Sequence, residues 1–255
     1  MALSLAHIST TERLRAGKSA IPSILELSTM DVFRWRDDFV GDLFFGGAAP
    51  GVYQSTASGT GAATAAISTG VVNGAILLDA GSDDAGRSDL SLGLHFRGDR
   101  NAHIWWRAQV SAVTSEKFEL GFTDVLSGTD AGAVNVKATP TFRADDAVVI
   151  CYDTTHNTTL QLLGVKATTA ETSVSFNTTI ALATDYYFGV ELRDDNARGH
   201  LLDANGRLIE STTWMDDAVT ATVLLTPWAF QQNRSASQRT MTIDLLYAYQ
   251  RRTTA

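Results

Sequence analysis

Polar and apolar side chains alternate along His103-Ile104-Trp105-Trp106-Arg107-Ala108-Gln109-Val110. In an extended strand, one face would carry Ile104, Trp106, Ala108 and Val110, and the other His103, Trp105, Arg107 and Gln109. We therefore predict a half-buried β-strand, with Trp106 in the core and Trp105 on the opposite face.

The same period of two recurs along the chain. It is found in residues 118–123, in residues 186–193 and in the closing segment, where Met241, Ile243, Leu245, Tyr247 and Tyr249 alternate with Thr242, Asp244, Leu246, Ala248 and Gln250. The run Val148-Val149-Ile150-Cys151-Tyr152 is apolar on both faces, which predicts a central strand covered on both sides. After residue 30 there is no long 3.6-residue period, so the sequence favours a two-sheet β-sandwich over a βαβ fold.

A turn signal separates two late apolar pairs. Asn205-Gly206 lies between Leu201-Leu202 and Leu208-Ile209, and this dipeptide predicts a hairpin with a type I′ turn, in which both central residues have positive φ.

Composition and charge limit the function classes. The chain has 255 residues, 44% of them hydrophobic, with 20 basic and 28 acidic side chains and a net charge of −8. Without a concentrated basic stripe, we expect no nucleic-acid binding. No apolar run reaches the roughly 18 residues of a membrane span, and no classical export signal begins the chain, so neither a membrane partner nor export is expected.

The first 32 residues differ in pattern from the rest. Ser9 and Glu12 have capping-box spacing, and Pro22 limits any helix that begins there. We predict an N-terminal arm over residues 1–32, partly helical or extended, and a sandwich domain over residues 33–255.

The order of these features resembles a known family. It comprises Arg36-Asp37-Asp38-Phe39, a Gly-rich stretch, Val72-Asn73-Gly74-Ala75-Ile76-Leu77-Leu78, Ile104-Trp105-Trp106, residues 118–123 and the hairpin 201–209. Over residues 33–250 the chain is similar to concanavalin-A-like jelly rolls, especially those of tailed-bacteriophage virion proteins. The resemblance implies an all-β jelly-roll sandwich with an N-terminal extension.

Catalytic residues are not indicated. Glycoside hydrolases of this fold use two carboxylates on one strand face, typically as Glu-x-Asp-x-x-Glu, and the sequence has no such triplet. Glu119 and Asp124 come nearest, but their spacing places them on opposite faces of a regular strand. We predict a protein that is not an enzyme and needs no cofactor.

Two sets of residues are candidates for binding. The loop from Asp79 to Asp89 offers Asp79, Asp83, Asp84 and Asp89 as calcium ligands, although such loops are more often solvated turns, and no metal is expected. Trp105, Trp214 and Trp228 are candidates for stacking on sugar rings or for anchoring a protein interface.

These features suggest two functions. The first is a non-enzymatic structural subunit of a bacteriophage particle, in the capsid decoration, tail or fibre, made in the host cytoplasm. It would contact other virion proteins and copies of itself, preferably as a trimer. The alternative is a lectin-like carbohydrate-binding module, with host-surface glycans as its ligands.

Overall fold

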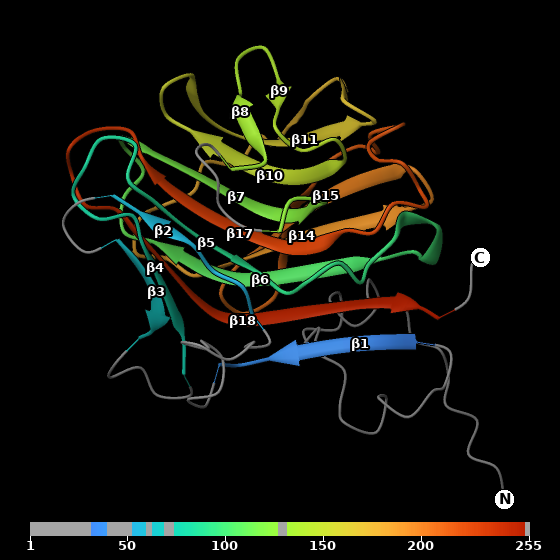
Figure 1. Cartoon of the computed structure of the whole chain (residues 1–255), viewed down its shortest axis with the longest axis horizontal. Coiled ribbons are helices and arrows are strands. Elements are labelled where there is room, and N and C mark those ends of the chain that lie inside the picture. Colours follow the sequence, from blue (N-terminus) through green and yellow to red (C-terminus); the bar gives the residue numbers. More distant parts are fainter. Residues whose placement is uncertain (1–31, 40–52, 60–62, 69–73, 127–131, 253–255) are drawn as a thin grey trace, which may run out of the picture.

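The computed structural model describes residues 32–39, 53–59, 63–68, 74–126 and 132–252. They form two large antiparallel sheets packed face to face and one small two-stranded sheet (Figure 1). Among these residues the only helical element is the 3-10 turn η2 (Gly98–Arg100), and no helix there is long and apolar enough to cross a membrane. The predicted all-β sandwich is confirmed. The predicted arm lies outside the described residues, except for Val32.

Sheet A has eight strands in the order β16-β15-β14-β6-β18-β4-β3, with β1 also paired to β18. Along its length β18 pairs with β6 on one side, and with β4 and then β1 on the other. The strands are β1 (Val32–Asp37), β3 (Thr64–Ile67), β4 (Ile76–Asp79), β6 (His103–Val110), β14 (Tyr186–Arg193), β15 (Asn196–Leu202), β16 (Leu208–Ser211) and β18 (Thr240–Arg251).

Sheet B has eight strands in the order β12-β11-β10-β7-β17-β5-β2, with β13 also paired to β11. The strands are β2 (Ala57–Ser58), β5 (Arg87–Ser91), β7 (Glu116–Thr123), β10 (Ala147–Asp153), β11 (Asn157–Lys166), β12 (Thr169–Ala170), β13 (Val174–Ser175) and β17 (Thr226–Asn233). The small sheet pairs β8 (Val134–Val136) with β9 (Thr141–Phe142).

The main core lies between sheets A and B. Ile104, Trp106, Ala108 and Val110 of β6 all belong to it, and Trp106 is 1% exposed. Burial of such alternating apolar side chains is the main favourable contribution to folding. The predicted faces of β6 are therefore confirmed.

A β-bulge in β18 changes which side chains face the core. Opposite β6, the register shifts between Ile243 and Leu245, so that Asp244 is the extra residue. Met241 and Ile243 face the core before the bulge, whereas Leu246 and Ala248 do so after it. The alternation seen in the sequence therefore continues only up to the bulge, because one inserted residue reverses it from Leu245 onward. Tyr247 and Tyr249 lie on the outer face of sheet A.

The Asn205-Gly206 hairpin forms, but with a longer loop than predicted. Gly206 has φ +75°, whereas Asn205 is not among the residues with positive φ. The Asp203 carboxylate accepts hydrogen bonds from the backbone N–H groups of Asn205 and Arg207, both at 2.9 Å. The side chain of Asp203 thus closes the loop, and the type I′ turn was a wrong prediction.

The outer face of sheet B is covered by the segment that contains β8 and β9. Ala133, Val134 and Ala144 pack against Val149, Cys151, Trp228 and Phe230, and together with Ala147, Leu163 and Val165 they form a second, fully buried apolar cluster. This cover explains why β10 is buried on both faces, as its sequence predicted.

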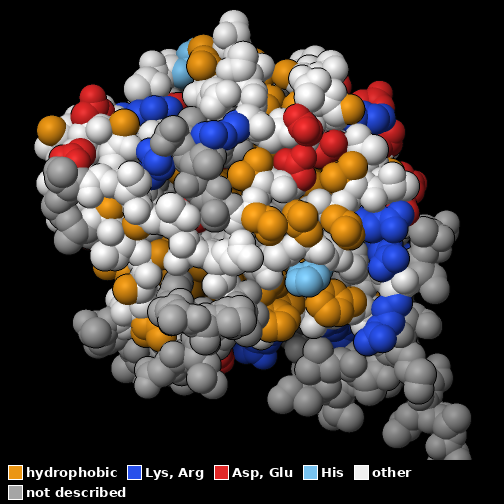
Figure 2. All heavy atoms as spheres, viewed as in Figure 1, with side chains coloured by type: hydrophobic (Ala, Val, Ile, Leu, Met, Phe, Trp, Pro, Cys, Tyr) orange, Lys and Arg blue, Asp and Glu red, His pale blue; other side chains and the backbone are white. Residues whose placement is uncertain are grey.

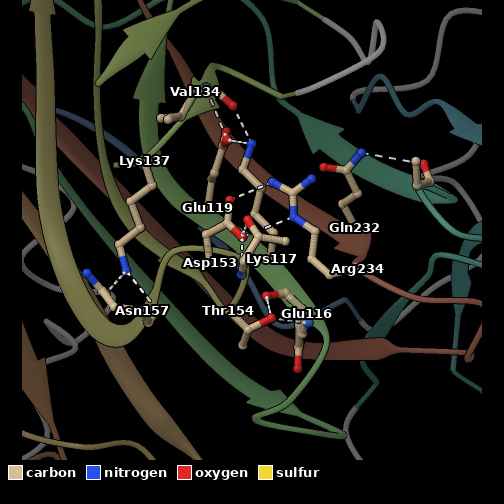
Figure 3. A network of polar contacts seen from close by, with 12 residues as sticks. Glu116, Lys117, Glu119, Val134, Lys137, Asp153, Thr154, Asn157, Gln232 and Arg234 are labelled. Atoms are coloured by element: carbon tan, nitrogen blue, oxygen red, sulfur yellow. Dashed lines mark hydrogen bonds and ion pairs between the residues drawn. The ribbon is translucent and has the colours of Figure 1, made fainter. Parts of the chain in front are cut away.

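A buried ion pair fastens this cover to the sheet. The Glu119 carboxylate lies 2.8 Å from Lys117 Nζ, and both side chains are fully buried. Glu119 also accepts hydrogen bonds from the backbone N–H of Ala133 (2.8 Å) and Val134 (3.1 Å) and from Trp228 Nε1 (3.0 Å). Lys117 donates in turn to the Val134 carbonyl, as Figure 3 shows. We call these contacts the Glu119 clamp.

We expect Glu119→Gln to lower the free energy of unfolding by about 3–5 kcal/mol, because it leaves the Lys117 ammonium buried without its carboxylate. Urea denaturation of both proteins measures the difference. The control is Glu171→Gln, the same chemical change at a partly exposed carboxylate, for which we expect a change within about 0.5 kcal/mol. Equal stability of the Glu119→Gln variant and the wild type would show that the clamp contributes nothing.

At one end of the core, a second buried carboxyl has an unusual environment. Glu116 begins β7 opposite Asn233 of β17 and is fully buried, and burial raises the pKa of its carboxyl to about 8 despite the Gln231 side chain and the charge of Arg239. The two Glu116 carboxyl oxygens lie beside the Gln231 amide. Among the described residues, neither these oxygens nor the two polar atoms of that amide have any other hydrogen-bond partner. A protonated carboxyl and an amide can satisfy each other with two hydrogen bonds, so we expect Glu116 to be neutral at pH 7.

This carboxyl should make stability depend on pH. Its pKa is about 8 in the folded chain against a usual 4.5, so the folded state holds the extra proton between these values. The stabilisation is present below pH 4.5 and is lost as pH rises to about 8. Urea midpoints at pH 5, 7 and 9 should therefore fall more steeply for the wild type than for Glu116→Gln. Parallel profiles for the two proteins would contradict a neutral Glu116.

Candidate functional site

The outer face of sheet A carries aromatic, imidazole and charged side chains on four adjacent strands. We call it the aromatic face and define it by His103, Trp105 and Arg107 of β6, Tyr187, Glu191 and Arg193 of β14, His200 of β15, Tyr247 and Tyr249 of β18, and the flanking Trp214, Asp185 and Asp244. Strand pairing places these residues side by side, since β6 lies between β14 and β18, and β15 pairs with β14.

Trp105 lies at the centre of this face. Its indole occupies the space above Gly189, where an added Cβ would come within 2.3 Å of the ring. The ring also stacks on His200, with centroids 5.5 Å apart, and packs with Leu202 and Tyr247. Only 7% of Trp105 remains exposed. The absence of a side chain at position 189 is thus what lets the indole lie flat on the sheet.

Two histidines flank one carboxylate beside Trp105. Glu191 Oε2 lies 3.3 Å from His200 Nε2, and Glu191 Oε1 lies 3.9 Å from His103 Nε2. Ser211 Oγ lies 2.8 Å from His200 Nδ1, which fixes the second imidazole. Burial lowers the pKa of His103 to about 4, so this ring is neutral at pH 7.

The carboxylate of Glu191 stays ionised. Burial raises its pKa, but the hydrogen bond with His200 and the nearby charges, including that of Arg193, outweigh burial and bring the pKa to about 2. Arg193 Nη2 lies 3.2 Å from Glu191 Oε1, and the same guanidinium lies 4.8 Å from the centre of the Trp214 ring. Arg193 therefore joins Trp214 to the histidine pair.

A second arginine organises the opposite end of the face. Arg107 forms ion pairs with Asp185, at 2.7 Å, and with Asp244, the bulge residue of β18. Its guanidinium also lies 5.8 Å from the centre of the Tyr187 ring. The bulge therefore supplies one of the two carboxylates that hold Arg107.

Several polar atoms of the aromatic face have no hydrogen-bond partner. In the described part of the chain these include Trp105 Nε1, Arg107 Nε and Asp244 Oδ1, all of them buried atoms. A ligand would reach the face through its partly exposed rings and guanidinium groups. These groups match the chemistry of a sugar, which has apolar ring faces and hydroxyl groups around its rim.

The structure places the three predicted tryptophans differently. Trp105 and Trp214 share the aromatic face, linked through Arg193, Glu191 and His200. Trp228 does not: it is fully buried beneath the cover of sheet B, and its indole donates to Glu119. The prediction that Trp228 contacts a ligand is corrected here, because the Glu119 clamp closes that face.

The predicted calcium loop uses its carboxylates within the chain. Asp79 accepts from Gly81 N at 2.8 Å and from the Gln238 side chain, while the buried Asp89 accepts from Thr56 N at 3.0 Å. Asn233 Nδ2 donates to the carbonyls of Ala80, Gly81 and Asp83. In the part of the chain that the structure describes, no group of three or more His, Cys, Asp or Glu side chains is placed to hold a metal. Calcium binding by Asp79, Asp83, Asp84 and Asp89 thus gains no support.

The nearest carboxylate pair of the sequence, Glu119 and Asp124, has structural contacts. Glu119 is held by the clamp, and Asp124 Oδ2 accepts from the backbone N–H of Asp146 at 3.1 Å. Burial raises the pKa of Asp124. Glu119 lies under the cover, so the two carboxylates are not placed to act on the same substrate.

Sequence reasoning missed most of the aromatic face. It grouped His103 and Arg107 with Trp105, but it did not connect them to Glu191, Arg193 or His200. The available signal was the alternation in β14, which places Tyr187, Gly189, Glu191 and Arg193 on one face. The pairing of β14 between β6 and β15, which joins these faces, is visible only in the structure.

Comparison with known proteins gives matches in structure only. No protein-family model matches the sequence, and no curated protein does either. Peanut lectin superposes with a TM-score of 0.59 at 9% identity, over 88% of this chain and 100% of the lectin chain. The carbohydrate recognition domain of Emp47p gives 0.54 at 11% identity, over 86% and 97%.

A third similar structure is a protein of unknown function from Shewanella oneidensis MR-1. It gives a TM-score of 0.57 at 14% identity, and the alignment covers 97% of both chains. None of these comparisons supports a bacteriophage origin. They do show the fold, because the sheet architecture described above matches that of lectins: the chain is a concanavalin-A-like jelly-roll β-sandwich.

Proposed function

We propose that this protein is a non-enzymatic carbohydrate-binding module, and that the aromatic face of sheet A is its binding surface. The observation that carries this proposal is the pairing of a partly exposed aromatic ring with an arginine at two places on one face: Tyr187 with Arg107, and Trp214 with Arg193. The lectin-like fold supports it as well.

The chemistry of the face suits a saccharide. Tyr187 and Trp214 are only partly buried, so each presents ring surface at the edge of the face. Arg107 and Arg193 are oriented by carboxylates and lie against these rings, which leaves further guanidinium N–H groups to donate to hydroxyl groups. A sugar would thus stack on the rings and bond to the charged groups beside them.

The virion role remains a prediction without support from the comparisons. The same holds for virion proteins as partners, for a trimer and for a location in the virion. The predicted arm, on which the assembly mechanism depended, lies outside the described residues.

The experiment is a glycan array probed with the wild type and with Tyr187→Ala and Trp214→Ala. We expect binding to at least one glycan, and a loss of about tenfold in affinity for each variant, because stacking contacts of this kind contribute about 1–1.5 kcal/mol. Leu224→Ala is the matched control, since Leu224 is a large apolar side chain that is 48% exposed and does not belong to the aromatic face.

Two results would overturn the proposal. One is an array without any glycan bound by the wild type. The other is a bound glycan whose affinity is unchanged in both aromatic variants, which would place the binding surface elsewhere.

A further inference from the structure

Arginines surround the aromatic face, although the chain as a whole carries −8. They point outward from the strands of sheet A at positions 34, 36, 107, 193, 198 and 251. Asp185 and Asp244 hold Arg107, and Glu191 holds Arg193. Exposed guanidinium groups attract anions locally.

Two of these arginines stand at the same end of the face. Arg193 ends β14 and Arg251 ends β18, and these strands are the two neighbours of β6. Both arginines are exposed. Figure 2 shows Lys and Arg side chains gathered at the right-hand border of the view, where Figure 1 places the end of β18 and the start of β1.

A stacked pair of rings lies next to the two arginines. The ring of His103 stacks on Tyr249 with centroids 4.4 Å apart and planes 8° apart. Burial chiefly lowers the pKa of His103, and the charges of Arg193 and Arg251 lower it further, so both guanidinium groups act on this ring. Glu191, the carboxylate of the aromatic face beside His103, is already bonded to His200 and Arg193.

Resting on the proposed function, we infer that the saccharide bound by this face is acidic, with its carboxylate or sulfate group between Arg193 and Arg251. A guanidinium offers parallel N–H donors that match the two oxygens of such a group. The partly exposed Trp214 ring, which lies against Arg193, gives the sugar ring a flat surface. Aromatic residues recognise the ring, and the two arginines distinguish acidic from neutral sugars.

The test uses an array of paired saccharides, each printed with and without its carboxylate or sulfate group. We expect the wild type to bind the acidic member at least tenfold more tightly, with the preference shrinking as salt is raised. The double variant Arg193→Gln/Arg251→Gln should lose the preference. Arg207→Gln, the same charge change at the exposed end of a hairpin, should keep it.

The outcomes separate this inference from the proposed function. Equal binding of acidic and neutral members would overturn the inference and leave the proposed function standing, whereas no binding at all would overturn both. A preference for acidic saccharides that persists in the double variant would also overturn the inference. Equally tight binding of a DNA duplex on the same array would show a general polyanion surface and not a saccharide site. Circular dichroism would establish that the double variant is folded.

Discussion

Four hydrogen-bond donors converge on the buried carboxylate of Glu119, and the attachment of the cover to sheet B depends on them. Lys117, Trp228 and the backbone of Ala133 and Val134 meet there. An ionised carboxylate is stable in the interior only when its oxygens are fully bonded, as they are here. The cost of burying two charges is offset by fixing a cover of apolar residues on sheet B. The aromatic and charged groups of the proposed binding surface lie on the other sheet, on the outer face of sheet A.

The aromatic face is organised by a different principle, in which long side chains are held by charges from neighbouring strands. Arg107 is held between Asp185 and Asp244, and Arg193 between Glu191 and the Trp214 ring. Such contacts are partly solvated, so each contributes little to stability. Their effect is to restrict the arginine rotamers, which lowers the entropy that a ligand must overcome when it binds.

Much of the fold follows from the two-residue alternation of apolar and polar side chains in the sequence, and much of the site does not. Alternation in residues 103–110 correctly separates Trp106 from Trp105, because a strand places neighbours on opposite faces whatever it pairs with. Trp228 could not be placed in the same way: both faces of β17 are buried, and the cover on one of them comes from a distant part of the chain. The grouping of Glu191 with His103 depends on the pairing of β14 with β6, which lie far apart in sequence, whereas His200 follows Glu191 in the same hairpin. Local patterns do not specify such pairing.

The bulge at Asp244 has a meaning for how this surface could have arisen. Strand β6 pairs Ala108 with Ile243 and Arg107 with Leu245, so Asp244 stands outside the one-to-one pairing of the two strands. Removal of Asp244 would leave a regular strand in which Leu246 and Ala248 still face the core and Tyr247 and Tyr249 still lie outside it. A single codon inserted into an older, regular strand would therefore have added a carboxylate beside Arg107 and left the packing on both sides of the insertion as it was.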